Sequence, residues 1–109
     1  MFHMLTCFDM KPEYTLEAFR QSLAAYTDHM RDLDLVVDYE PIGQRQSDTA
    51  MDTDTERDHG YFMLMHFRDR GQCDDAVDYI KSHEQPGASK HEAVYTKVQN
   101  PIFICWQDI

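Results

Sequence analysis

The chain has 109 residues, of which 20 are acidic and 10 are Lys or Arg, so its formal net charge is −10. A chain of this length forms one domain, residues 1–109, with a single hydrophobic core. So acidic a surface repels phosphate groups, which argues against nucleic acid as a partner. No stretch approaches the roughly 20 apolar residues of a membrane span, no signal-peptide pattern opens the chain, and three Cys form no complete disulfide framework. We therefore expect a cytoplasmic protein that does not bind a membrane.

The first expected elements are a strand and a long helix. Residues 2–8 are apolar and β-prone, which predicts a strand, and Pro12 follows it. Thr15 can cap the N-terminus of a helix, with Glu17 in the first turn, where the helix dipole favours an acid. Hydrophobic residues then recur at alternating spacings of three and four, which predicts one buried helical face. These residues are Leu16, Phe19, Leu23, Tyr26, Met30 and Leu33.

Two further strands are expected in the middle of the chain. Residues 35–44 alternate apolar and acidic side chains, which predicts a strand. Pro41 and Gly43 make it irregular, because proline donates no hydrogen bond to a sheet. Residues 46–59 form a polar, acidic connection, and residues 61–67 predict a third strand that is apolar on both faces.

A second helix is expected after the third strand. Asp69 and Gln72 have the spacing of a capping box, in which each side chain satisfies a free backbone N–H at the helix start. The helix is expected to end near His83, and Pro86 and Gly87 then break the chain.

A short third helix and a last strand complete the chain. Ser89 and Glu92 form a second capping box, and the helix is expected to reach Val98. Residues 102–107 predict the last strand. The order β-α-β-β-α-(α)-β predicts a ferredoxin-like α+β fold. In that fold a four-stranded antiparallel sheet has the order fourth, first, third, second, and the helices cover one face.

Alternation along the strands separates two faces of the expected sheet. The more apolar face is assigned to the helices and carries Phe2, Met4, Phe8, Leu35, Val37, Tyr39, Tyr61, Met63, Met65, Phe67, Ile102, Ile104 and Trp106. The other face is mixed and carries His3, Leu5, Cys7, Val36, Asp38, Glu40, Ile42, Phe62, Leu64, His66, Phe103, Cys105 and Gln107.

The mixed face is too apolar to remain exposed in a monomer. A two-fold homodimer that packs sheet against sheet would cover it and could enclose a cavity. The residues expected to line such a cavity and contact a ligand there are Leu5, Cys7, Glu40, Phe62, Leu64, Phe103, Cys105 and Gln107.

Four segments together carry a resemblance to a known family: FHMLTCFDMKP, EYTLEAFRQSLAAYTDHM, GYFMLMHFRDRGQCDDAVDYIKSHEQ and HEAVYTKVQNPIFICWQ. They resemble the dimeric α/β-barrel superfamily, which includes stress-responsive barrel proteins and antibiotic-biosynthesis monooxygenases. The resemblance implies ferredoxin-like protomers that pair into a barrel. It also implies a small apolar or aromatic ligand and cofactor-independent chemistry, such as oxygenation or isomerisation of that molecule. No member's catalytic residues transfer to this chain one by one.

Three polar residues of the mixed face are expected to converge. His3 opens the first strand and His66 closes the third, and symmetric pairing of the second and third strands puts Asp38 opposite His66. Two histidines and a carboxylate can act as an acid–base set or can ligate a transition metal. The favoured interpretation is hydrogen-bonded histidines at a dimer seam. His83 and His91 flank the Pro-Gly break, where either could touch a ligand, although solvated turn residues are the favoured interpretation.

The sequence therefore leaves two candidate functions open. The first is a small-molecule-binding protein or a cofactor-independent enzyme, oxygenase-like or isomerase-like, that uses a cavity on the mixed face of a homodimer. The second is a non-catalytic homodimeric binding or assembly protein. No cofactor is predicted, and haem or a transition metal stays open as an alternative.

Overall fold

The computed structural model describes all 109 residues. Its helices and strands follow the predicted order, except that the second predicted strand is divided in two. The elements are β1 (Phe2–Met10), α1 (Leu16–Asp32), β2 (Asp38–Tyr39), β3 (Gly43–Gln44), β4 (Tyr61–Phe67), α2 (Arg70–Ser82), α3 (Gly87–Tyr95) and β5 (Val98–Gln107).

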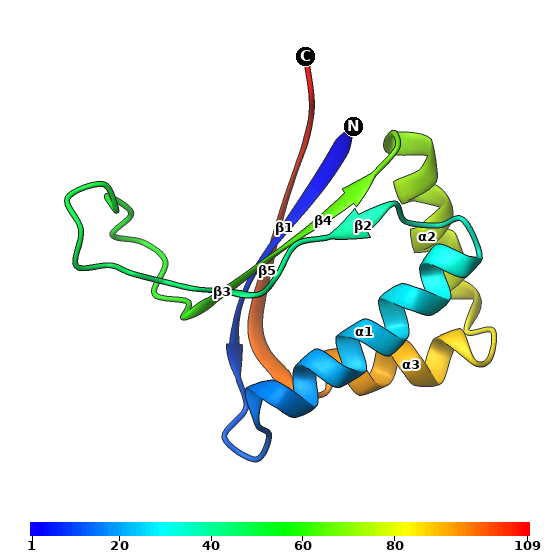
Figure 1. Ribbon diagram of the computed structural model, residues 1–109, viewed down its shortest axis with the longest axis horizontal. Coiled ribbons are helices and arrows are strands. Elements are labelled where there is room, and N and C mark those ends of the chain that lie inside the picture. Colours follow the sequence, from blue (N-terminus) through cyan, green and yellow to red (C-terminus); the bar gives the residue numbers. More distant parts are fainter.

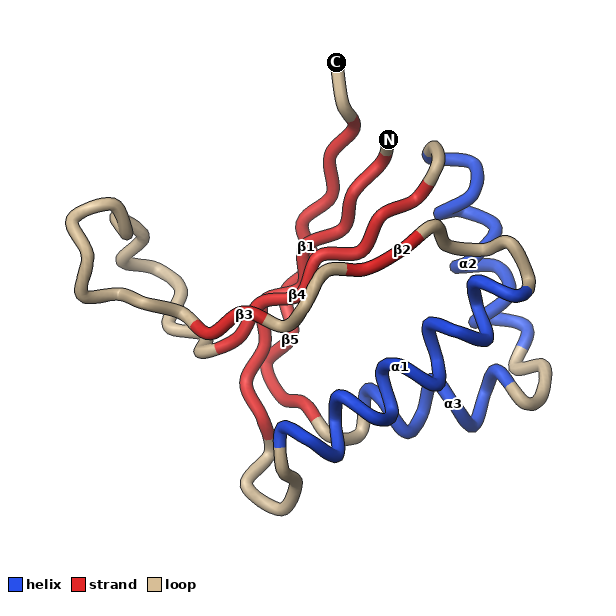
Figure 2. Tube along the Cα trace, viewed as in Figure 1, coloured by secondary structure: helices blue, strands red, loops and turns tan.

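The strands form one antiparallel sheet in the order β2-β4-β1-β5, and β3 also pairs with β4. This is the predicted strand order, in which β1 and β4 pair although they are distant in the sequence. All three helices cover one side of the sheet, and the other side carries no helix (Figure 1 and Figure 2). We call these sides the helix side and the open face. None of the helices is both long enough and apolar enough to cross a lipid bilayer.

The caps of the first two helices are those predicted from the sequence. The Thr15 hydroxyl accepts a hydrogen bond from the backbone N–H of Ala18 at 3.1 Å, and the Asp69 carboxylate accepts one from Gln72 at 2.8 Å. The Gln72 side chain also donates to the backbone oxygen of Asp34 at 3.0 Å. This amide therefore fixes the start of α2 against the connection that follows α1.

The last helix begins and ends earlier than predicted, and the last strand begins earlier but ends at Gln107 as predicted. The third helix starts at Gly87 and ends at Tyr95, and β5 starts at Val98. Val98 is predicted at the end of the helix, but it pairs with Met10 at the end of β1 and therefore begins β5. Such long-range pairing is invisible to local helix signals.

Register with β1 puts the side chains of β5 on the faces opposite to those predicted. Met4 lies opposite Cys105 and Thr6 lies opposite Phe103, and Met4, Thr6 and Phe103 all face the helices. The predicted assignment is therefore wrong along this strand. The helix side carries Phe103, Cys105 and Gln107, and the open face carries Ile102, Ile104 and Trp106. Both sets are largely apolar, so alternation alone does not choose between them.

The predicted faces are also wrong before β2 and beyond it. Val36 is 3% exposed and belongs to the core, whereas Val37 is 39% exposed. Ile42 packs against the core as well, instead of lying on the open face. Regular alternation begins only at Asp38 and is interrupted before β3, so it does not extend through these residues.

The acidic connection between β3 and β4 is organised around Arg45. Its guanidinium binds both carboxylate oxygens of Asp52 at 2.9 Å and donates to the backbone oxygens of Asp54 and Arg57. The hydrogen bonds from Arg45 to Asp52 hold the pKa of the Asp52 carboxyl below its usual range. Figure 1 shows the segment reaching away from both the sheet and the helices.

Candidate functional site

A cavity of about 350 Å³ lies between the helix side of the sheet and the three helices. This volume falls in the range of small-molecule sites, roughly 300–1,000 Å³. The cavity lies on the opposite side of the sheet from the one predicted to hold a ligand. Its lining is almost wholly hydrophobic and comprises Met4, Thr6, Phe8, Phe19, Leu23, Tyr26, Met30, Val36, Met63, Met65, Phe67, Cys73, Ala76, Val77, Ile80, Lys81, His91, Val94, Tyr95, Val98, Pro101 and Phe103.

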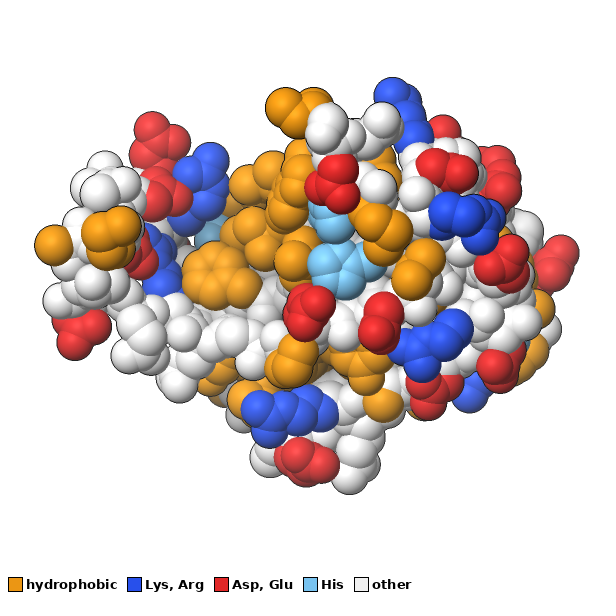
Figure 3. All heavy atoms as spheres, turned by 45° about the horizontal axis from the view of Figure 1, so that its top comes forward, with side chains coloured by type: hydrophobic (Ala, Val, Ile, Leu, Met, Phe, Trp, Pro, Cys, Tyr) orange, Lys and Arg blue, Asp and Glu red, His pale blue; other side chains and the backbone are white.

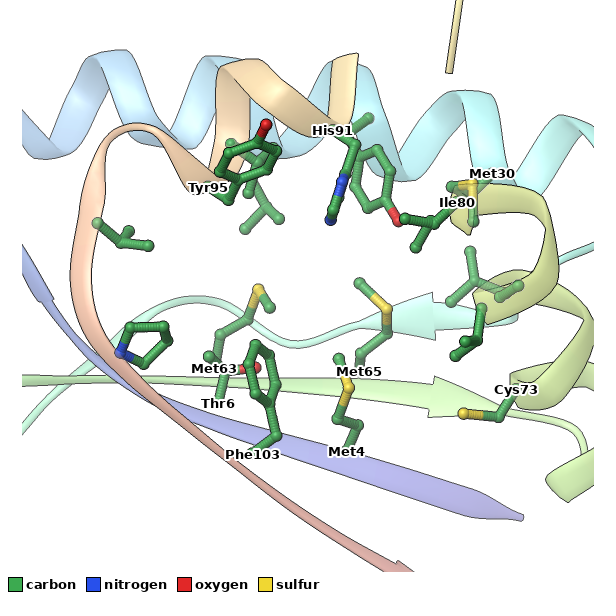
Figure 4. A pocket seen from close by; sticks show the side chains of 18 of the residues that line it. Met4, Thr6, Met30, Met63, Met65, Cys73, Ile80, His91, Tyr95 and Phe103 are labelled. Atoms are coloured by element: carbon green, nitrogen blue, oxygen red, sulfur yellow. The ribbon is translucent and has the colours of Figure 1, made fainter. Parts of the chain in front are cut away.

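The sheet supplies one wall of the cavity and the helices the other. In the view of Figure 4, Met4 and Met65 rise from the strands, while Met30 and Ile80 point toward them from the helices. Methionine side chains are unbranched and adapt to irregular shapes. Such a lining can reshape itself around an apolar molecule.

Thr6 places a polar atom inside this apolar wall. The residue is 6% exposed, and its hydroxyl oxygen has no hydrogen-bond partner. An unpaired hydroxyl in an apolar environment is destabilising by about 1–3 kcal/mol. The oxygen itself has almost no accessible surface, so a ligand in the cavity does not reach it unless the Thr6 side chain turns.

His91 points into the cavity from α3 (Figure 4). Its ring packs between those of Tyr26 and Tyr95, with ring centres 5.4 and 5.1 Å away, and it forms no hydrogen bond. Burial lowers the pKa of this imidazole below its ordinary value. At neutral pH the ring is therefore uncharged and offers one N–H donor and one free nitrogen acceptor.

The mouth of the cavity lies between α2, α3 and β5. Three lining residues from these elements are strongly exposed: Val77 by 41%, Tyr95 by 53% and Phe103 by 59%. Lys81 is also exposed and is the one Lys, Arg, Asp or Glu in the lining. A molecule in the cavity would pass these side chains on entry.

The open face carries a chain of four hydrogen-bonded polar side chains. Nδ1 of His3 lies 2.7 Å from Nδ1 of His66. Nε2 of His3 lies 2.8 Å from the Asp108 carboxylate, and Nε2 of His66 lies 2.9 Å from the Glu40 carboxylate. Figure 3 shows the histidines among hydrophobic side chains, with acidic groups on either side.

All four ring nitrogens of His3 and His66 are engaged in this chain. Each Nε2 donates to a carboxylate when it carries a proton, and a third proton can lie between the two Nδ1 atoms. The indole of Trp106 packs against His3, with ring centres 5.2 Å apart. No nitrogen of the pair is left free for another molecule unless one of these contacts opens.

The predicted meeting of His3 and His66 is confirmed, but Asp38 does not join them. Asp38 lies opposite His66 in the sheet, yet its carboxylate accepts hydrogen bonds from Arg31 at 2.7 Å and from the backbone of Tyr39 at 2.8 Å. The partner of His66 is Glu40 instead. No three metal-binding side chains gather in this structure as a site for an ion.

The other predicted site residues divide between the two faces. Leu5, Phe62 and Leu64 lie on the open face, and so does Cys7, which is 2% exposed. Burial raises the pKa of the Cys7 thiol. Phe103 lines the helix-side cavity, and Cys105 and Gln107 share its face. Their role in ligand binding stays a prediction, as does the catalytic role of His3, His66 and Asp38.

The favoured interpretation of His91 as a solvated turn residue is wrong, while that of His83 is right. His83 is the exposed C-terminal cap of α2, in a left-handed conformation. His91 sits one helix later and faces inward. The signal available in the sequence is its spacing: Val94 and Tyr95, three and four residues later, lie on the same face of α3 and also line the cavity.

No protein-family model matches this chain, and no curated protein matches it. Solved structures do match. Protein At3g17210 from Arabidopsis thaliana superposes with a TM-score of 0.74 at 6% identity, over 100% of this chain and 96% of that one. A dimeric ferredoxin-like protein of unknown function from Jannaschia sp. CCS1 has a TM-score of 0.65 at 12% identity, over 98% of both chains.

A protein described as an antibiotic biosynthesis monooxygenase also matches, with a TM-score of 0.61 at 11% identity, over 100% of this chain and 99% of that one. At such identities the likeness establishes the fold. The ferredoxin-like α+β fold predicted from the sequence is therefore confirmed.

Proposed function

We propose that this protein binds a small, largely apolar molecule in its helix-side cavity. The observation that carries the proposal is a cavity of about 350 Å³ whose lining is almost wholly hydrophobic. Its volume and lining are typical of small-molecule sites. An apolar ligand would occupy space that the side chains leave empty.

The proposal also includes a homodimer that forms through the open face. Ile102, Ile104 and Trp106 are 38%, 40% and 42% exposed there, beside Leu5 and Leu64. Adjacent apolar side chains exposed on one sheet face are typical of a protein interface. The likeness to a protein described as dimeric supports the same assembly. In such a dimer each protomer keeps its own helix-side cavity.

The catalytic form of the proposal is a cofactor-independent oxygenase or isomerase. Such chemistry needs a base in contact with the substrate. His91 has free ring nitrogens and lines the cavity, whereas His3 and His66 lie across the sheet from it. We therefore propose His91 as the base for a substrate held there. The predicted acid–base role of His3 and His66 applies to a substrate on the open face.

Nuclear magnetic resonance (NMR) of the ¹⁵N-labelled protein tests the binding proposal. Neutral apolar probes such as decanol and indole should shift the amide signals of Thr6, His91 and Tyr95. A Val77→Trp variant, which blocks the mouth, should weaken binding, and Leu33→Trp, at an exposed site on the end of α1, should not. The proposal fails if no probe binds or if the shifts centre on Leu5 and Leu64.

The non-catalytic assembly protein remains the second candidate. The observation that favours it is the fully engaged His3–His66 chain, which lies among the apolar residues of the proposed dimer interface. Light scattering tests the interface: Ile104→Glu should convert the dimer to a monomer, and Leu33→Glu should leave the dimer intact. A wild-type monomer at micromolar concentration would remove the dimer from both candidates.

A further inference from the structure

We infer that the ligand of the helix-side cavity is an amphipathic carboxylate, with its anionic group bound by Lys81 and its apolar part inside. This inference rests on the proposed binding function and names the class of ligand. It depends on three features of the site: the charge at the mouth, the apolar lining and the volume.

Lys81 is the charged residue of an otherwise uncharged lining. It lies in the last turn of α2, next to Ile80, and both residues line the cavity. A basic residue at this position complements the helix dipole. That role does not require the side chain to border a cavity, whereas binding the anionic group of a ligand inside the cavity does.

The positive charge of Lys81 is free. Each of the six arginines forms an ion pair with an Asp or Glu, although the chain carries an excess of ten acids. None of the four lysines forms an ion pair, and Lys81 is the one that lines the cavity. It also forms no hydrogen bond, although Asp78 lies one helical turn before it. An ammonium group that remains free on so acidic a protein is available to a carboxylate from solution.

The interior of the cavity selects the rest of the molecule. Its walls carry no carboxylate, guanidinium or amide side chain, so a second charged group would be desolvated without compensation. At about 30 Å³ for each water-sized unit, 350 Å³ accommodates roughly a dozen heavy atoms. A carboxylate with a chain of about ten carbons fits this volume, and decanoate is the simplest probe.

Titration calorimetry with three probes tests the inference on the intact protein. Decanoate, decanamide and decylamine share one alkyl chain and are anionic, neutral and cationic at pH 7.5. Used below their micellar concentrations, they separate the charge preference from the hydrophobic contribution. We expect decanoate to bind about five-fold more tightly than decanamide, as for a partly exposed ion pair, and decylamine to bind most weakly.

Three variants then assign the preference to one side chain. Lys81→Met keeps the apolar stem and should reduce decanoate binding to the level of decanamide, whose own affinity should not change. Lys81→Arg keeps the charge and should retain the preference. Lys90→Met removes one positive charge from α3 outside the cavity lining and is the matched control, with the wild-type preference expected.

The outcomes distinguish this inference from the proposal beneath it. Decanamide that binds as well as decanoate, or a preference that survives in Lys81→Met, overturns the carboxylate assignment and leaves the cavity as a site for neutral molecules. If none of the three probes binds, the proposed function fails and the inference fails with it.

Discussion

Thr6→Val should make the protein more stable. The buried hydroxyl of Thr6 has no partner, and valine replaces it with a methyl group of nearly the same shape. Val is also at least as favourable as Thr in a strand. Removing an unpaired buried hydroxyl should raise the free energy of unfolding by about 1 kcal/mol, the lower end of the range for such groups. We take the lower end because Thr6 borders the cavity, so the new methyl group gains fewer packing contacts than in a filled core.

Thr27→Val provides the same change in a fully packed position. Thr27 is 0% exposed on α1, its hydroxyl also lacks a partner, and it does not line the cavity. We expect a gain of about 1–2 kcal/mol there. Thr96→Val is the contrasting control, since its hydroxyl donates to the backbone oxygen of Glu92 at 2.7 Å. That variant should show no gain.

Urea unfolding measures all three variants against wild type. The slope of the free energy with urea concentration should stay constant while the midpoint moves, because the surface exposed on unfolding is unchanged. A gain of 1 kcal/mol should also raise the melting temperature by about 5 °C in a domain of this size. Loss of stability in both Thr6→Val and Thr27→Val would refute the reasoning, because it would show that these hydroxyls are paired in solution.

Three further predictions concern pH and the acidic connection. Burial lowers the pKa of His91 from its ordinary 6.5, so stability should fall as pH drops below about 6.5, where the unfolded chain takes up the proton first; His91→Phe should flatten this slope in urea titrations. The hydrogen bond from His3 lowers the pKa of the Asp108 carboxyl from 3.8. The stabilisation by this pair should therefore be complete above pH 3.8 and be lost as the pH falls through the lowered pKa of Asp108. Asp108→Asn should remove this loss, and an Asp108 carboxyl that titrates by NMR at an unshifted pKa would contradict the pairing. Arg45→Met should speed proteolysis within residues 46–58 without moving the melting temperature much, and equal cleavage rates in mutant and wild type would show that Arg45 does not order this connection.

Much of the fold follows from local patterns in the sequence. The spacing of Phe19, Leu23 and Met30 predicts the buried face of α1, and Thr15 and Asp69 predict the starts of two helices. These signals depend only on residues within one or two turns of each other. The meeting of His3 and His66 could also be predicted, because it requires only the strand order and the two-residue period of a strand.

Tertiary structure alone decided the face of β5, the partners of the histidines and the location of the cavity. Phe103 and Trp106 are equally suited to either face, and pairing with β1 makes the choice. Asp38 could not be distinguished from Glu40 as the partner of His66, because the competing Arg31 comes from α1. The hydrophobic pattern that predicts a core is the same whether side chains from opposite walls meet or leave a space between them. That difference depends on the distance between the sheet and the helices, which no local spacing of residues encodes.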